Sequence, residues 1–161
     1  MKAWIELHKR LKLKTPQLIL AGKRGWKVDE LLSLLNFTGH VSGLVSIIDN
    51  ASDLAINHLY ENCLFTVYPS LYEGWGLPVG ESLWHGKTCV TSNVSALPEV
   101  GRDLCVYVDP HDIGDIYRKV LDLVEHPQKR LRLEQKIARA TLRSWADVAA
   151  DVDRELQLDD R

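Results

Sequence analysis

Cysteine is scarce in this sequence and does not occur in pairs. The 161 residues include three cysteines, Cys63, Cys89 and Cys105, which lie far apart, each in or beside an apolar run. An odd, widely spaced set excludes a disulfide framework. No Cys-x-x-Cys and no paired histidines at ligand spacing are found, so no structural zinc is expected. We therefore expect buried free thiols, no metal and a reducing, cytoplasmic environment.

Long apolar runs and an excess of positive charge are also missing. No apolar run approaches the length of a membrane span, and we expect no signal peptide before the domain. The formal net charge of −2 gives no argument for a nucleic-acid partner. The early basic cluster in residues 9–14 is best explained as the solvated face of a helix, with a patch for a membrane surface or an acidic partner as the minority interpretation. The length and composition fit one soluble domain, residues 1–161.

Short apolar runs alternate with stretches at helical spacing along the whole chain. Several runs are apolar on both faces, which is typical of parallel strands covered by helices. The pattern predicts an α/β fold with a Rossmann-like, doubly wound parallel sheet. The expected strands are 17–21, 44–48, 63–68, 88–91 and 104–108, and the expected helices include 2–13, 28–35, one capped by Ser52, one from Pro78, one from Asp112 and one near Ser144.

Three loops with chemically useful residues follow the ends of these strands. They are Gly22–Trp26, Glu73–Glu81 and Ser92–Glu99. Ligands of doubly wound sheets bind beyond the carboxyl ends of the strands, so we expect the three loops to share one rim.

The stretch Tyr68–Ser82 is the most informative of the three. Gly74 and Gly76 bring bare backbone N–H groups close to a ligand, and the helix that starts near Pro78 adds partial positive charge, which suits a phosphate. Glu73 and Glu81 can accept hydrogen bonds from hydroxyls. A ligand with both phosphates and hydroxyls is a sugar nucleotide.

The same stretch, Tyr68-Pro-Ser-Leu-Tyr-Glu-Gly-Trp-Gly-Leu-Pro-Val-Gly-Glu-Ser82, resembles the signature of the retaining GT-B glycosyltransferases of group 1, or family 4. Glu73 and Glu81 match the Glu-x7-Glu motif of that family. Four flanking motifs also fit, at 18–26, 96–101, 107–110 and 144–146. The motif at 18–26 looks like that of a subgroup that makes bacterial polysaccharides, often with mannose-type donors.

The resemblance implies a role for each matching residue. Glu73 would contact the donor sugar at the reacting face, and Glu81 would bind the ribose hydroxyls. Gly74, Trp75, Gly76 and Leu77 would offer backbone N–H groups to the sugar and the phosphates. Lys23 or Arg24 would reach the nucleotide, although the match there is less specific. The donor would be a nucleotide diphosphate sugar, with no cofactor and no metal ion.

The sequence departs from the family at its start. The resemblance implies that an N-terminal acceptor domain is absent and that the chain begins after the first strand of the donor domain. In the strand order 3-2-1-4-5-6 that strand is central. We expect either that strands 17–21 and 64–68 pair directly or that another chain fills the gap in a homo-oligomer. The fragment alone is expected to be inactive, and the intact enzyme to be cytoplasmic or peripheral at the inner membrane.

Functions of other classes remain open at this point. The chain is alternatively a non-catalytic interaction or assembly module built on the same sheet, and more remotely a sugar-nucleotide epimerase of the GT-B type. Ser95 and Glu99 fit either a site lining or a helix cap. His40, His85 and His111 are expected to be structural or solvated. Trp75 is expected to shape the site, whereas the other tryptophans are expected in the core: Trp4, Trp26, Trp84 and Trp145.

Overall fold

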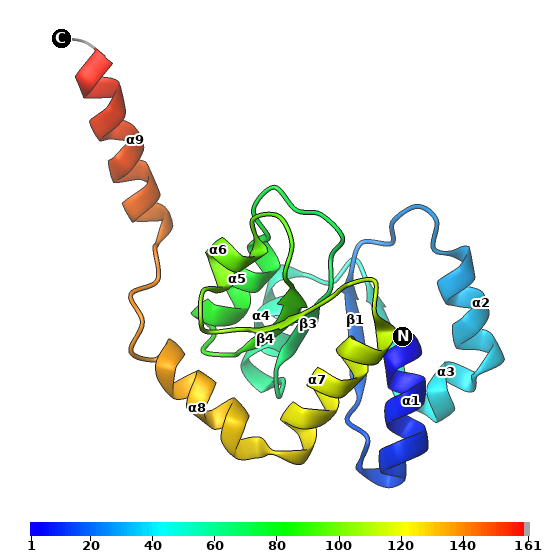
Figure 1. Ribbon diagram of the computed structural model, residues 1–161. Coiled ribbons are helices and arrows are strands. Elements are labelled where there is room, and N and C mark those ends of the chain that lie inside the picture. The colour runs from blue at the N-terminus through cyan, green and yellow to red at the C-terminus, as the bar shows by residue number, and fades with distance from the viewer. Residues whose placement is uncertain (160–161) are drawn as a thin grey trace.

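The computed structural model describes residues 1–159, and side chains as far as residue 157. Helices and strands alternate along the chain (Figure 1). The strands are β1 (Leu18–Gly22), β2 (Val45–Asp49), β3 (Thr66–Tyr68), β4 (Cys89–Ser92) and β5 (Val106–Val108). The helices are α1 (Lys2–Leu11), α2 (Asp29–Phe37), α3 (Gly39–Gly43), α4 (Asp53–Asn62), α5 (Leu77–Trp84), α6 (Leu97–Gly101), α7 (Ile113–Glu125), α8 (Pro127–Ile137) and α9 (Trp145–Asp159), and a 3-10 turn, Lys12–Lys14, follows α1.

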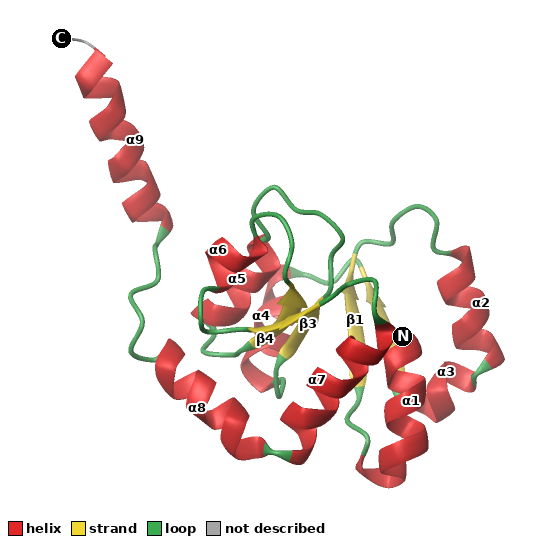
Figure 2. Cartoon of the chain, viewed as in Figure 1, coloured by secondary structure: helices red, strands yellow, loops and turns green. Residues whose placement is uncertain are grey.

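The strands form two parallel sheets with helices packed against them (Figure 2). One sheet has the order β1-β2, with Leu18 opposite Val45. The other has the order β3-β4-β5, with Val67 opposite Val90 and Val90 opposite Val106. The predicted α/β class and the parallel direction of the strands are confirmed.

The predicted direct pairing of strands 17–21 and 64–68 is wrong. Within residues 1–159, β1 pairs with β2 and β3 with β4, and no ladder joins β1 to β3. A cavity of about 300 Å³ is lined by β1 residues and by Val67 of β3. The helices, rather than a strand ladder, set the distance between the sheets, because α1 packs on α7 and fills the shared core.

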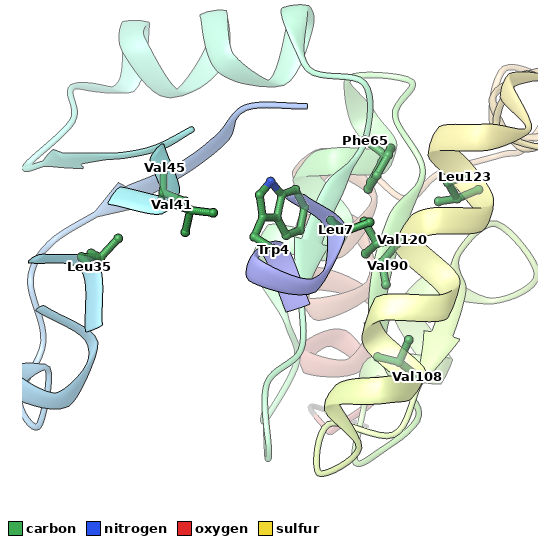
Figure 3. Packing of buried hydrophobic residues seen from close by; sticks show 10 residues of the cluster. All are labelled: Trp4, Leu7, Leu35, Val41, Val45, Phe65, Val90, Val108, Val120 and Leu123. Atoms are coloured by element: carbon green, nitrogen blue, oxygen red, sulfur yellow. The ribbon is translucent and has the colours of Figure 1, made fainter. Parts of the chain in front are cut away.

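The core that spans both sheets is built from α1 and α7 together with the strands. Figure 3 shows Trp4 and Leu7 lying between Val45 on one side and Val120 on the other. The indole Nε1–H of Trp4 donates to the carbonyl oxygen of Pro16 at 2.9 Å, so the buried polar atom has a partner. Burial of side chains of this size stabilises each by about 1.5–3 kcal/mol.

A second core lies on the other face of the β3-β4-β5 sheet, under α5 and α6. Cys89 faces this core, whereas its neighbour Val90 belongs to the first one. All four residues of β4 are buried, because helices cover both faces of the strand. This coverage fixes the loops after β3 and β4 to a rigid support.

Local sequence signals place several helix ends correctly. The hydroxyl of Ser52 accepts from the N–H of Ala55, the carboxylate of Asp112 accepts from the N–H of Gly114, and Ser144 accepts from the N–H of Asp147. Two expectations need correction. Only Thr66–Tyr68 of the stretch 63–68 is a strand, and the stretch 36–43, expected to be irregular, contains the turn of α3 with positive φ at His40, Val41 and Ser42.

The expected burial of four tryptophans holds for one of them. Trp4 is buried, but Trp26, Trp84 and Trp145 are 84%, 56% and 76% exposed. Trp145 begins α9, which extends away from the rest of the molecule (Figure 1), so the apolar side of that helix has no core to enter.

None of the helices described for residues 1–159 is both long enough and apolar enough to cross a membrane.

Candidate functional site

The candidate site lies at the carboxyl ends of the strands. The loops that follow β1 and β3 emerge at the same end of the molecule, the upper end in Figure 1. Because β3 and β4 run parallel, the loops that leave them also share one edge. A hydrogen bond joins those two loops, from the N–H of Glu73 to Oγ of Ser95 at 3.0 Å. At least the loops after β3 and β4 therefore form the expected common rim.

Glu73 is held at both its backbone and its side chain. The hydroxyl of Tyr68, the last residue of β3, donates to Glu73 Oε1 at 2.5 Å. Burial and the hydrogen bond to Glu73 raise the pKa of Tyr68 to about 12, so the hydroxyl stays protonated and remains a donor at neutral pH. Ser95, with a positive φ of 49°, places its hydroxyl under the backbone of Glu73.

The backbone from Gly74 to Leu77 has free donors. No acceptor within residues 1–159 takes the N–H groups of Gly74, Trp75, Gly76 or Leu77. Gly76 precedes α5 with φ of 91°, and a Cβ there would collide with Leu97 of α6. Glycine is therefore required at this position by both conformation and space. Unpaired N–H groups at the start of a helix are suited to an anion.

Glu81 lies on the second turn of α5 and is also bound by a tyrosine. The hydroxyl of Tyr60, on α4, donates to Glu81 Oε2 at 2.8 Å and lies 3.4 Å from the carbonyl oxygen of Pro78. The ring of Tyr60 stacks on His85, with centroids 5.0 Å apart. Burial, followed by the hydrogen bond to Glu81, raises the pKa of Tyr60, so this hydroxyl is also a permanent donor near neutral pH.

The two cations after β1 are not joined to the glutamate loop. The backbone N–H of Arg24 donates to Asp49 Oδ1 at 3.0 Å, and its Nε lies 3.6 Å from Asp49 Oδ2. Lys23 is exposed and lies beside Arg24 at the cavity between β1 and β3. Among the described residues, no hydrogen bond or ion pair links either cation to Glu73 or Glu81. Arg24 is thus already engaged by a carboxylate.

The rim is open on the side of the aromatic residues. Trp75 and Leu77 are about half exposed, and Tyr72 is 80% exposed. Exposed aromatic side chains beside acceptors and N–H donors suit a polyhydroxylated ligand that is covered from the other side. The site-shaping role expected of Trp75 stays a prediction.

Three residues contribute contacts to the glutamates that the sequence pattern does not predict: Tyr60, Tyr68 and Ser95. The pattern places Tyr68 on a strand and Tyr60 on the apolar side of a helix, and it offers Ser95 as a site lining or a cap. Tyr68 ends β3 with its polar tip at the rim. The alternation of side chains along this strand is the signal that could have predicted the contact of Tyr68 with Glu73. Tyr60 lies 21 residues from Glu81, and no local pattern connects the two.

Two of the histidines near loop ends contact other parts of the chain. His40 Nδ1 lies 3.1 Å from the carbonyl oxygen of Val45, and His85 stacks on Tyr60. No group of three or more His, Cys, Asp or Glu side chains suited to a metal ion occurs in the part of the chain that the structure describes. The groups that the structure gathers at the rim are therefore two carboxylates and a row of N–H donors.

Known proteins are similar to this chain in sequence. Residues 1–140 match the family model described as glycosyl transferases group 1. The chain is 36% identical over 129 residues to the O-antigen chain mannosyltransferase B of Escherichia coli, covering 80% of this chain and 34% of that protein. It is 32% identical over 115 residues to the MMP alpha-(1->4)-mannosyltransferase of Mycolicibacterium hassiacum, covering 68% of this chain and 28% of that protein. The chain thus spans about a third of the length of these relatives.

Solved structures share the fold. WaaG, a glycosyltransferase involved in lipopolysaccharide biosynthesis, superposes with a TM-score of 0.77 at 17% identity, over 94% of this chain and 41% of that one. The sucrose-phosphate synthase of Thermosynechococcus elongatus gives a TM-score of 0.77 at 18% identity, over 97% and 41%.

The sequence-based prediction of family and fold class is confirmed by these matches. The family model covers most of the chain, and the solved structures show the same alternation of parallel strands and helices as part of a larger fold. The chain belongs to the group 1 glycosyl transferases and has part of the GT-B fold.

Proposed function

We propose that this chain is the donor-binding domain of a retaining glycosyltransferase that uses a nucleotide diphosphate sugar, with a mannose-type donor favoured. The intact enzyme transfers the sugar to a glycan or lipid-linked acceptor in polysaccharide biosynthesis. The observation that carries the proposal is the row of free N–H groups at 74–77 between two tyrosine-bound glutamates. The mannosyltransferase names of relatives at 32–36% identity support the sugar assignment.

Each group has a role that matches its chemistry. Glu73 accepts hydrogen bonds from the donor sugar at its reacting face, which makes it the catalytic candidate. Glu81 accepts from the ribose hydroxyls, and an ionised carboxylate suits a pair of neighbouring hydroxyls. The N–H groups of Gly74, Trp75, Gly76 and Leu77 bind the sugar and the diphosphate between them.

The reaction breaks the bond between the anomeric carbon and the diphosphate oxygen and forms a bond to the acceptor oxygen on the same face. The acceptor proton leaves with the diphosphate. Negative charge grows on the leaving diphosphate, and N–H groups with Lys23 stabilise it without a metal ion. Arg24 joins them only after it releases Asp49.

The chain on its own lacks the acceptor side of this reaction in the proposed arrangement. An N-terminal domain supplies that side in the intact enzyme, which acts in the cytoplasm or peripherally at the inner membrane. The isolated chain therefore binds nucleotide weakly and turns nothing over.

Calorimetric titration with GDP, UDP, GDP-mannose and UDP-glucose tests the proposal directly. We expect measurable binding of at least one nucleotide, and about tenfold or greater weakening in Glu81→Gln, because a charge-assisted hydrogen bond contributes about 1.5–3 kcal/mol. Glu155→Gln on α9 is the matched control, since it removes the same charge far from the rim and leaves binding unchanged. A folded sample that binds none of the nucleotides contradicts the proposal.

The alternative is a non-catalytic interaction or assembly module, expected to be built on the sheet; the observation that favours such a module is instead the exposed apolar side of α9. Trp145, Val152 and Leu156 are each more than half exposed on that helix. The module predicts that Glu73→Ala and Glu81→Ala alter stability alone, so the same titrations separate the two functions.

A further inference from the structure

Each glutamate of the rim is paired with a tyrosine from a different element. Tyr68 of β3 donates to Glu73 at 2.5 Å, and Tyr60 of α4 donates to Glu81 at 2.8 Å. The Tyr68–Glu73 pair is local, with partners five residues apart in sequence, whereas the Tyr60–Glu81 pair joins residues 21 apart on two helices. The recurrence of one contact type at both glutamates points to a shared purpose.

Each tyrosine occupies one carboxylate oxygen and leaves the other available. Tyr68 uses Oε1 of Glu73 and Tyr60 uses Oε2 of Glu81, and no hydrogen bond within residues 1–159 involves Glu73 Oε2 or Glu81 Oε1. A glutamate side chain on an open rim otherwise samples many rotamers, and ordering it on binding costs about twofold to tenfold in affinity. A hydroxyl that holds one oxygen removes much of that cost and fixes the direction of the free oxygen.

The tyrosines are themselves held by rigid elements. The backbone of Tyr68 lies opposite Thr91 in the sheet, and Thr91 Oγ1 donates to the carbonyl oxygen of Tyr68 at 3.0 Å. The ring of Tyr60 is stacked on His85 at an interplanar angle of 12°. Side chains supported in this way hold a binding group more precisely than loop contacts alone.

We propose that Tyr60 and Tyr68 are positioning residues, which present Glu81 to the ribose and Glu73 to the transferred sugar of the donor. The inference rests on the proposed function, because it assigns separate parts of the donor to the two glutamates. The hydroxyls themselves do not react. They act on affinity through the glutamates, and each affects only the part of the donor that its glutamate binds.

The two assignments make different predictions for a nucleoside diphosphate and for its sugar conjugate. We measure binding of GDP and GDP-mannose, or of the UDP pair if that base is preferred, to Tyr60→Phe and Tyr68→Phe by calorimetry. Tyr60→Phe weakens both ligands equally, by about twofold to tenfold, because the variant must order the Glu81 side chain when it binds the ligand. Tyr68→Phe leaves the nucleoside diphosphate unchanged and weakens the sugar nucleotide by a similar factor.

Tyr107→Phe is the matched control. The hydroxyl of Tyr107 donates to the carbonyl oxygen of Arg102 at 2.7 Å, so the control loses a hydrogen bond of similar length that no glutamate accepts. It is expected to bind both ligands like the wild type. Circular dichroism of all three variants verifies that each is folded.

A double variant separates positioning from a structural effect. In a Glu81→Ala background Tyr60 has no carboxylate to orient, so adding Tyr60→Phe causes no further loss of affinity. If Tyr60→Phe lowers affinity in the Glu81→Ala background as much as it does in the wild type, the positioning role is overturned. The role is also overturned if both tyrosine variants bind like the wild type while Glu73→Gln and Glu81→Gln bind weakly. Those results leave the proposed function intact, whereas wild-type binding by the two glutamate variants overturns the function and the inference together.

Discussion

At the residue scale, Gly76 is the position of the glutamate loop that is least tolerant of substitution. At its φ of 91° any side chain is strained, and a Cβ there would displace the side chain of Leu97, whereas Gly74 has no positive φ and a Cβ there would meet no atom within 4 Å. The two glycines, two residues apart, therefore have different reasons to be present. Gly76 fixes the backbone, and Gly74 keeps the approach to the N–H groups open.

Gly76→Ala is expected to lower the free energy of unfolding by about 2–3 kcal/mol, the combined cost of a strained φ and a displaced leucine. Urea denaturation followed by circular dichroism measures this change in the free energy of unfolding. Gly74→Ala is the paired control and should change stability by less than about 0.5 kcal/mol. Equal effects of the two substitutions would show that the backbone of the loop is not organised around Gly76.

The cysteines also differ at the residue scale. Burial raises the pKa of all three thiols, to about 11 for Cys105, but Cys89 and Cys105 are buried whereas Cys63 is half-buried and therefore the most accessible of the three. The thiolate is the reactive form, so buried thiols of raised pKa react slowly.

Titration with a thiol-reactive disulfide reagent at about pH 8, close to the ordinary pKa of a free thiol, is expected to modify Cys63 alone in the folded protein, and all three thiols in denaturant. Mass spectrometry of digested samples identifies the modified residue. Rapid modification of Cys89 in the native protein would contradict the burial of β4 on both faces.

At the scale of elements, α7 and α9 show that helical apolar spacing leads to different environments in two helices. Val120 and Leu123 of α7 are buried in the core that spans both sheets. Val152 and Leu156 of α9 repeat a similar spacing but are 53% and 62% exposed. Helical periodicity identifies an apolar side, and only packing decides whether anything covers it.

The same contrast between a buried and an uncovered apolar side chain is tested by Ile137→Ala on α8 and Val152→Ala on α9. Ile137, near the end of α8, is buried in the second core, so its truncation is expected to cost about 2–5 kcal/mol of unfolding free energy. Val152→Ala, on α9, should leave it unchanged within about 0.5 kcal/mol. Chemical denaturation compares the two, and a large loss in Val152→Ala would show that α9 packs on the domain.

At the scale of the whole molecule, two sheets face each other across a cavity without a strand ladder. β1 and β3 both have an edge without a strand partner in residues 1–159, and Ile19 and Val67 line the space between them. Unpaired edges of this kind favour association with another chain.

We expect the chain to self-associate through this region, as the remaining hypothesis for the incomplete sheet requires. Size-exclusion chromatography with light scattering measures the mass at increasing concentration. Ile19→Lys, which puts a charge in the cavity, should shift the population towards monomer, whereas Leu13→Lys on the exposed turn after α1 should not. A clean monomer at high concentration would rule out this association.

The sequence alone determined the family, the α/β class, several helix ends and the stretch that carries both glutamates. These features depend on local information: the period of apolar residues, caps such as Ser52 and Asp112, and a contiguous signature at Tyr68–Ser82. A contiguous motif can be recognised from the sequence because its residues act on the same short backbone segment.

Only the tertiary structure decided which side chains hold the glutamates and how the sheets meet. Tyr60 reaches Glu81 because α4 and α5 are brought together, and the separation of β1 from β3 follows from α1 packing on α7. The exposure of Trp145 likewise depends on the position of α9 relative to the rest of the molecule. Contacts between distant segments result from the balance of packing over the whole chain, so no local pattern of residues encodes them.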